Sequence, residues 1–224
     1  KKIAKEKAGI IKPTTPTLIG RKQKEVYTFF EEYAKSKKST IYYSINCDLE
    51  TDLKGIYQKE NKNTAVTAIK ILKKQKWNIS KKNIVNGLKN VQKNTPLLGR
   101  WTILCNSPLI ICDTGHNEDG IKCILKEINQ TKFKKLHFIL GMVKDKSIDK
   151  ILKLLPKKAL YYFCQAEIPR SLKPHVLQLI GSKYQLIGDT YSSVHSALKT
   201  AKMNAKEKDL IFVGGSTYVV GEII

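Results

Sequence analysis

The stretch of sequence that decides the fold spans residues 99–120 and reads GRWTILCNSPLIICDTGHNEDG. It holds two apolar runs separated by a turn at residues 106–108, and we predict that both runs are strands. The second run, residues 109–112, is bounded by polar residues, as is typical of a strand buried on both faces. A polar loop at residues 113–117 follows it. Ligands bind beyond the carboxyl ends of strands in open α/β sheets, so this loop is the first candidate for a functional site.

Strand and helix patterns alternate along the chain after this stretch. We predict strands at residues 136–142, 160–165, 185–187 and 210–214, and helices at residues 118–129, 148–155, 173–180 and 192–204. Such alternation is typical of an α/β fold with a Rossmann-like, doubly wound and mainly parallel sheet.

The first 95 residues show a less regular pattern. Helices are predicted at residues 1–12, 23–37 and 61–74, and short strands at residues 17–20 and 40–45. Ser80 is the predicted N-cap of a further helix. A polar segment ending in Pro96 closes this part, and we predict a domain boundary between residues 95 and 96.

Composition narrows the class of protein. The 224 residues are 42% hydrophobic, enough for a buried core, and carry a net charge of +22 from 41 basic and 19 acidic residues. The basic residues are mostly Lys and are spread along the chain, which favours attraction of anionic substrates over a role in nucleic-acid binding. No apolar run is long enough to span a bilayer, so we expect no membrane partner. The five Cys form no CxxC pair, which indicates reduced thiols in a cytoplasmic protein rather than a zinc or redox site.

Three further strings make the interpretation specific. They are IAKEKAGIIKP at residues 3–13, GIYQKENKNTAVT at residues 55–67 and GGSTYVVGE at residues 214–222. In this order, and with residues 99–120, they resemble the folylpolyglutamate synthase/dihydrofolate synthase family of the Mur ligase superfamily. The resemblance implies that residues 1–95 are the last part of a Mur-ligase-type central ATPase domain, and that residues 96–224 are the C-terminal, glutamate ligase domain.

The same resemblance shows that the sequence lacks a phosphate-binding loop. The nucleotide-binding domain of the family begins with a Gly-rich phosphate loop, and no segment here matches GxxxxGK[ST]. We therefore expect the chain to be a C-terminal portion of the enzyme, inactive without the region that holds the triphosphate.

The resemblance implies cofactor-binding roles for four side chains. Arg100, Asp113 and Asn61 match residues that contact ATP; an arginine fork suits phosphate, and an acid suits ribose hydroxyls. Lys7 matches a lysine that is carbamoylated and binds Mg²⁺ in the intact enzyme. Carbamoylation requires a neutral amine and turns a cation into a carboxylate-like ligand.

Two more residues carry the implied catalytic roles. His116 and Ser216 match residues that bind the incoming glutamate or orient acyl transfer. Asp145 and Lys146 are expected to order the same cleft. The other three histidines, at 137, 175 and 195, fall within predicted regular elements and are interpreted as structural.

The implied reaction is an ATP-dependent amide ligation. ATP would phosphorylate a carboxylate of a folate or of dihydropteroate, and the amine of L-glutamate would attack the acyl phosphate. Two alternatives stay open at this point: a UDP-muramyl-type amino-acid ligase, and a non-catalytic basic α/β domain that binds polyanions. We expect a monomer.

Overall fold

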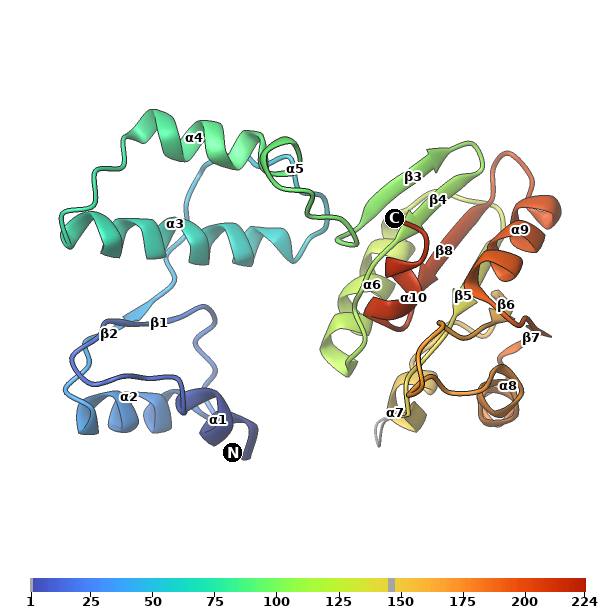
Figure 1. Cartoon of the computed structure of the whole chain (residues 1–224), viewed down its shortest axis with the longest axis horizontal. Coiled ribbons are helices and arrows are strands. Elements are labelled where there is room, and N and C mark those ends of the chain that lie inside the picture. Colours follow the sequence, from blue (N-terminus) through green and yellow to red (C-terminus); the bar gives the residue numbers. More distant parts are fainter. Residues whose placement is uncertain (1, 145–147) are drawn as a thin grey trace. The chain divides into compact units, whose positions relative to one another are not determined.

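The computed structural model describes residues 2–144 and 148–224, which divide into two compact units (Figure 1). The first unit comprises residues up to 52 together with residues 57–96, and the second comprises residues 53–56 and 97–224. The division after residue 96 lies one residue from the boundary predicted from the sequence. No helix in the described part of the chain is both long and apolar enough to cross a membrane.

The first unit is built around a two-stranded parallel sheet. β1 (Thr17–Ile19) pairs with β2 (Ile41–Tyr43). Its helices are α1 (Lys2–Ala8), α2 (Tyr27–Ser36), α3 (Gln58–Lys74), α4 (Lys81–Lys89) and α5 (Val91–Asn94). Ser80 caps α4 as predicted, because its side chain accepts a hydrogen bond from the backbone N–H of Asn83.

The second unit contains a six-stranded sheet in the order β3-β4-β8-β5-β6-β7. β3 pairs with β4 in antiparallel fashion and all the other pairs are parallel, so the predicted mainly parallel, doubly wound sheet is confirmed. The strands are β3 (Thr102–Asn106), β4 (Leu109–Cys112), β5 (Leu136–Leu140), β6 (Leu160–Phe163), β7 (Ile187–Thr190) and β8 (Leu210–Gly214).

Helices cover both faces of this sheet. The helices are α6 (Glu118–Gln130), α7 (Ile148–Leu152), α8 (Pro174–Ser182), α9 (Val194–Asn204) and α10 (Thr217–Gly221). Successive strand residues point to opposite faces. Thus Phe212 of β8 packs in a core with α6, α7 and α8, whereas its neighbour Val213 packs in a separate core with α9 and α10.

The main difference from the predicted elements concerns β7. The sequence indicated a strand at residues 185–187, but the strand begins at Ile187 and runs through a Gly-Asp-Thr segment of low strand propensity. Gln185 has a φ of 63° and turns the chain, and Leu186 is buried in the core below the sheet edge. Parallel pairing of β7 with β6 therefore overrides the local propensity.

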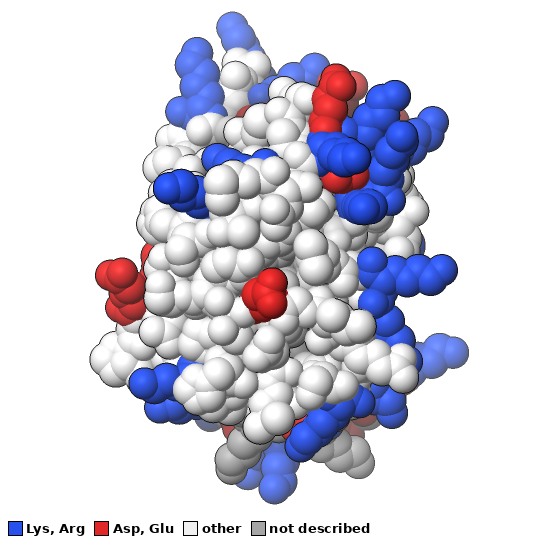
Figure 2. Space-filling view, turned by 90° about the vertical axis from the view of Figure 1, so that its right-hand side faces the viewer, with Lys and Arg blue, Asp and Glu red and all other residues white. Residues whose placement is uncertain are grey.

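The excess of basic residues is dispersed on the face of the molecule shown in Figure 2. There, Lys and Arg side chains lie mostly around the margin, and the centre is covered by uncharged residues with an acidic side chain among them.

Candidate functional site

A cavity of about 400 Å³ lies at the carboxyl edge of the six-stranded sheet. Loops that follow four parallel strands contribute to it: β4, β5, β6 and β8. The lining residues are His116, Met142, Val143, Ile151, Arg170, Gly215, Ser216, Thr217 and Tyr218. Its volume is within the range of about 300–1,000 Å³ that is typical of small-molecule sites.

The topology of the sheet explains why a cavity forms here. β8 is the last strand in the sequence but lies directly beside β4. The chain leaves β4 toward α6, on one face of the sheet, and leaves β8 toward α10, on the other face. Neighbouring loops that diverge to opposite faces leave a crevice between them, which is the usual ligand position in open α/β sheets.

Gly215 allows two of these loops to approach closely. Its φ is 95°, and a Cβ atom there would lie 2.7 Å from the carbonyl oxygen of Gly141. Any larger residue would be strained and would push the loop after β8 away from the loop after β5. The glycine therefore fixes the position of Ser216, the next residue.

Ser216 is 3% exposed and is the N-cap of α10. Its Oγ accepts a hydrogen bond from the backbone N–H of Tyr218 at 3.2 Å. Because this bond uses the oxygen as acceptor, the hydroxyl keeps a proton that it can donate to a ligand. Ser216 is thus a hydrogen-bond donor on the cavity wall.

His116 is exposed and lines the same cavity. Its Nδ1 is 3.0 Å from the carbonyl oxygen of Thr114. A carbonyl can only accept, so Nδ1 carries a hydrogen and, in the neutral ring, Nε2 is left as an acceptor. The imidazole is therefore oriented to accept a proton or a hydrogen bond through Nε2.

The structure brings together the two residues that the sequence analysis singled out as catalytic. His116 and Ser216 line the same cavity, from loops after adjacent strands. Their roles in binding glutamate or orienting acyl transfer stay predictions.

Asp113 plays a structural part at this edge. It is 3% exposed; its Oδ2 accepts the backbone N–H of Trp101 and its Oδ1 accepts that of Gly115, both at 2.8 Å. The bond from Trp101 ties the loop after β4 to the segment that precedes β3, and the bond from Gly115 lies within that loop. Arg100, which lies in that segment, is exposed, and its guanidinium donates to the carbonyl oxygen of Gly99 at 3.3 Å. Neither Asp113 nor Arg100 lines the cavity, and their contacts with ATP stay predictions.

The remaining predicted site residues lie elsewhere. Lys7 is exposed on α1, and Asn61 on α3 donates a hydrogen bond to Gln58 at 3.0 Å. Both belong to the first unit. Asp145 and Lys146 lie outside the described residues. Among the described residues there is no cluster of three or more His, Cys, Asp or Glu that could hold a metal ion. The carbamoylation of Lys7 and its binding of Mg²⁺ stay predictions.

Arg170 is a charged lining residue for which the sequence motifs implied no role. It follows β6, in the loop that leads to α8. The signal available in the sequence was its position: a Pro-Arg pair just beyond the carboxyl end of a predicted strand.

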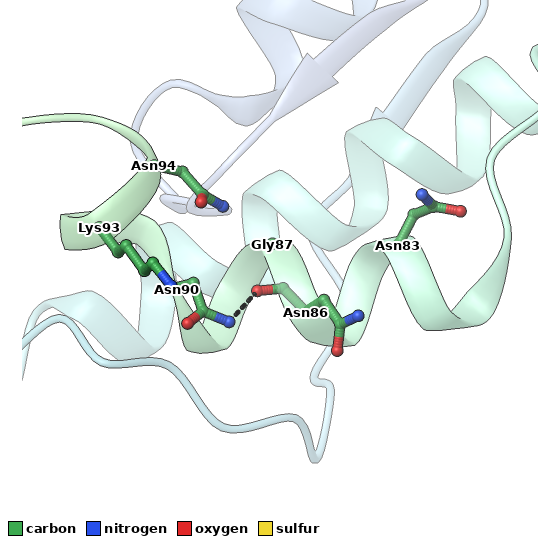
Figure 3. A pocket seen from close by; sticks show the side chains of 6 residues that line it. All are labelled: Asn83, Asn86, Gly87, Asn90, Lys93 and Asn94. Atoms are coloured by element: carbon green, nitrogen blue, oxygen red, sulfur yellow. Dashed lines mark hydrogen bonds between the residues drawn. The ribbon is translucent and has the colours of Figure 1, made fainter.

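A second cavity, of about 510 Å³, lies in the first unit beside α4 and α5 (Figure 3). Amide side chains dominate its lining, and Asn90 donates to the carbonyl oxygen of Asn86 at 2.9 Å. The lining residues are Asn83, Asn86, Gly87, Asn90, Lys93 and Asn94. These residues lie on exposed helical turns, and α4 and α5 bury none of their described residues.

His137 belongs to a buried polar cluster away from the cavity. Its Nδ1 is 2.9 Å from the hydroxyl of Tyr162, and its Nε2 is 3.4 Å from Oδ2 of Asp209. Asp209 also accepts the backbone N–H groups of Lys135 and Lys206. The cluster joins β5, β6 and the start of β8, which agrees with a structural part for His137.

A mainly parallel sheet with helices on both faces and a cavity at its carboxyl edge defines a Rossmann-like α/β domain. Residues 99–217 match the family described as Mur ligase, glutamate ligase domain, and the chain belongs to that family.

Similar proteins agree with the resemblance predicted from the motifs, which is confirmed. A dihydrofolate synthase/folylpolyglutamate synthase of Buchnera aphidicola is 27% identical over 241 residues, covering 99% of this chain and 56% of the relative. A probable bifunctional folylpolyglutamate synthase/dihydropteroate synthase of Haloferax volcanii is 28% identical over 176 residues, covering 78% of this chain and 20% of the relative. The chain thus spans little more than half the length of the first relative and a fifth of the second.

Solved structures share the fold. Escherichia coli FolC in complex with DHPP and ADP has a TM-score of 0.81 at 23% identity, covering 99% of this chain and 55% of that chain. A bifunctional folylpolyglutamate synthase/dihydrofolate synthase with Mn, AMPPNP and L-glutamate bound has a TM-score of 0.79 at 21% identity, covering 99% of this chain and 55% of that chain.

Proposed function

We propose that this chain is the carboxyl-terminal part of an ATP-dependent ligase that joins L-glutamate to a folate, to dihydropteroate or to both. The observation that carries the proposal is the pairing of His116 and Ser216 around one cavity at the carboxyl edge of the sheet, within the segment that matches the glutamate ligase domain. The similar structures with nucleotide, DHPP or L-glutamate support the same substrate classes.

In this proposal the cavity receives the amino acid. The neutral Nε2 of His116 takes a proton from the ammonium group of L-glutamate, because only the free amine is a nucleophile. The hydroxyl of Ser216 donates a hydrogen bond to the amino acid and limits its orientation. ATP supplies the phosphoryl group that activates the acceptor carboxylate, and the free amine of glutamate then displaces phosphate.

The nucleotide and metal are held outside this cavity. Arg100 is exposed, and its guanidinium, which makes one long bond to the carbonyl oxygen of Gly99, would turn to a phosphate, whereas Asp113 supports the segment that carries Arg100 through its bond to Trp101. Asn61 and a carbamoylated Lys7 in the first unit would contribute one nucleotide contact and one Mg²⁺ ligand. The remaining ligands and the phosphate loop would come from a further region of the enzyme.

The proposal makes the chain dependent on that region. By itself it should not turn over ATP, because no segment matches the Gly-rich phosphate loop. We place the enzyme in the cytoplasm and treat it as a monomer that acts on small anionic substrates.

A glutamate-incorporation assay tests the proposal. Two proteins are compared: the 224-residue chain, and the polypeptide extended upstream along its gene to include a phosphate loop. With ATP, Mg²⁺ and L-glutamate, the extended protein should glutamylate tetrahydrofolate or dihydropteroate, and the chain alone should not. Ligation to a UDP-muramyl acceptor instead, or salt-sensitive binding of nucleic acid without ligation, would refute the proposal.

A further inference from the structure

Arg170 places a positive charge on a cavity whose described lining contains no acidic residue. The side chain of Arg170 is exposed. Among the described residues, its guanidinium has no hydrogen-bond or ion-pair partner. An arginine is always charged and its planar fork matches a carboxylate. The charge is therefore available to a ligand rather than used in the fold.

The backbone on both sides of Arg170 is firmly held. Its carbonyl oxygen accepts the backbone N–H of Lys144 at 3.0 Å, and the N–H of Leu172 donates to the carbonyl oxygen of Met142 at 2.8 Å. An isolated β-bridge between Val143 and Ser171 lies between these bonds. The loop after β6 is thus clamped to the loop after β5, which reduces the conformational freedom that binding would otherwise remove.

The position of Arg170 along the sheet indicates which part of a ligand it contacts. His116 and Ser216 follow the adjacent strands β4 and β8, whereas Arg170 follows β6, with β5 between β6 and β8. Strands are spaced about 4.8 Å apart, so the end of β6 is about 10 Å from the end of β8 and about 14 Å from the end of β4, before the side chains narrow the gap. An amino acid whose amine lies near His116 would extend its side chain toward Arg170.

From these observations we infer that Arg170 is a specificity-determining residue that binds the side-chain carboxylate of the incoming amino acid. The inference rests on the proposed function, because it assumes that the cavity holds L-glutamate. The apolar side chains of Met142, Val143 and Ile151 would then cover the methylene groups. An acidic side chain of this length pairs with the arginine, whereas a neutral amide of the same length leaves the charge unpaired.

Side-chain NMR of the 224-residue chain tests the inference directly. The sequence has only three arginines, Arg21, Arg100 and Arg170, so their Nε–H resonances can be assigned by substitution. L-Glutamate should move the Arg170 resonance together with the backbone amides of residues 115–117 and 215–217. L-Glutamine should bind about tenfold more weakly and leave the Arg170 resonance in place.

Three variants complete the test. Arg170→Ala should weaken glutamate binding about tenfold and bring the affinities for glutamate and glutamine to about the same value. Arg170→Lys should restore part of the preference, since it keeps the charge but loses the fork. Lys173→Ala removes an exposed cation three residues away that does not line the cavity, and should change neither affinity.

Two other results of the NMR titration would overturn the inference. Glutamate binding that moves the loop amides but not the Arg170 resonance, or that is unchanged in Arg170→Ala, would assign the side-chain carboxylate to another group and leave the proposed function intact. A chain in which saturating glutamate moves no resonance would also overturn the inference, and the incorporation assay would then decide the proposed function separately.

Discussion

The carboxylate of Asp113 and the backbone N–H of Trp101 lie 2.8 Å apart, which joins the end of β4 to the residue before β3. Trp101 has a φ of 51°, a conformation that non-glycine residues adopt only with support from their surroundings. Its ring is buried, with its centroid 6.0 Å from that of Phe212. The buried acid thus stabilises a strained residue and presents the neighbouring Arg100 to solvent.

We expect Asp113→Ala to lower the free energy of unfolding of the second unit by about 2–4 kcal/mol, because two buried N–H groups lose their acceptor. Urea unfolding should be followed by Trp101 fluorescence in a Trp77→Phe background, since the chain has two tryptophans. Asp119→Ala, an exposed acid in the first turn of α6, is the control and should cost about 0.5 kcal/mol. Equal losses in the two variants would contradict the structural part of Asp113.

The nucleotide role is better tested at Arg100 than at Asp113, because truncating Arg100 removes no buried contact. In the extended protein, Arg100→Ala should raise the Michaelis constant for ATP about tenfold, with no change in the urea midpoint. Arg21→Ala, which removes an exposed arginine paired with Glu60 at 2.5 Å, serves as the control. Unchanged ATP kinetics in Arg100→Ala would exclude this residue from the nucleotide site.

Two glycines should respond in opposite directions to substitution by alanine. Gly87 lies inside α4, and an added Cβ would meet nothing within 4 Å, so Gly87→Ala should stabilise the first unit by about 1 kcal/mol. Gly215→Ala should destabilise the second unit by about 1–3 kcal/mol, because the backbone there has a positive φ and no space. Chemical unfolding followed by circular dichroism measures both. A destabilising Gly87→Ala would show that α4 is not the regular helix described.

Asp209 gives the second unit an acid-sensitive contribution to stability. Burial raises the pKa of this carboxyl, but the hydrogen bonds from the Lys206 backbone, from His137 and from the Lys135 backbone outweigh burial and lower it below its usual value. Because the pKa is lower in the folded state, ionised Asp209 stabilises the protein at pH values above the unfolded-state pKa of about 3.9. This stabilisation is lost as the pH falls through the folded-state pKa.

Asp209→Asn should therefore destabilise the protein at neutral pH by about 1–3 kcal/mol, and the difference from the wild type should shrink below about pH 4. Urea unfolding at a series of pH values measures it, with the exposed neighbour Glu207→Gln as control. A difference that stays constant down to pH 2.5 or so would contradict the contribution of ionised Asp209.

The five cysteines should fall into two reactivity classes. Burial first, and the Asp113 carboxylate second, raise the pKa of the Cys112 thiol to about 12, and burial also raises the pKa of the Cys164 thiol. Only thiolates react with disulfide reagents or iodoacetamide. In the native protein at pH 8, Cys47, Cys105 and Cys123 should be labelled, and the other two only after unfolding, as mass spectrometry would show. Native labelling of Cys112 would contradict its burial.

Strands could be predicted from the sequence where their side chains are buried on both faces of the sheet. β4 and β8 have the predicted bounds, because an unbroken apolar run in a parallel sheet has no competing signal. β7 could not be placed, since an edge strand that contains Gly188 and Asp189 owes its conformation to pairing with β6 rather than to propensity.

The site could be predicted only in part, for a similar reason. His116 and Ser216 follow adjacent strands and were recognisable by their polar loops. Arg170 could be placed just beyond the end of a predicted strand, but its presence in the cavity could not be predicted. That presence depends on the clamp between the loops after β5 and β6, which involves residues distant in sequence. The structural part of Asp113 was also hidden, since the sequence does not show that its acceptor capacity is directed at two backbone N–H groups.

The central place of β8 has a consequence for how the protein is made. Leu210–Gly214 pairs with both β4 and β5, so the other strands cannot form a continuous sheet until this late segment arrives. Until β8 has been synthesised, β4 and β5 therefore expose unpaired edges that a nascent-chain chaperone would need to shield.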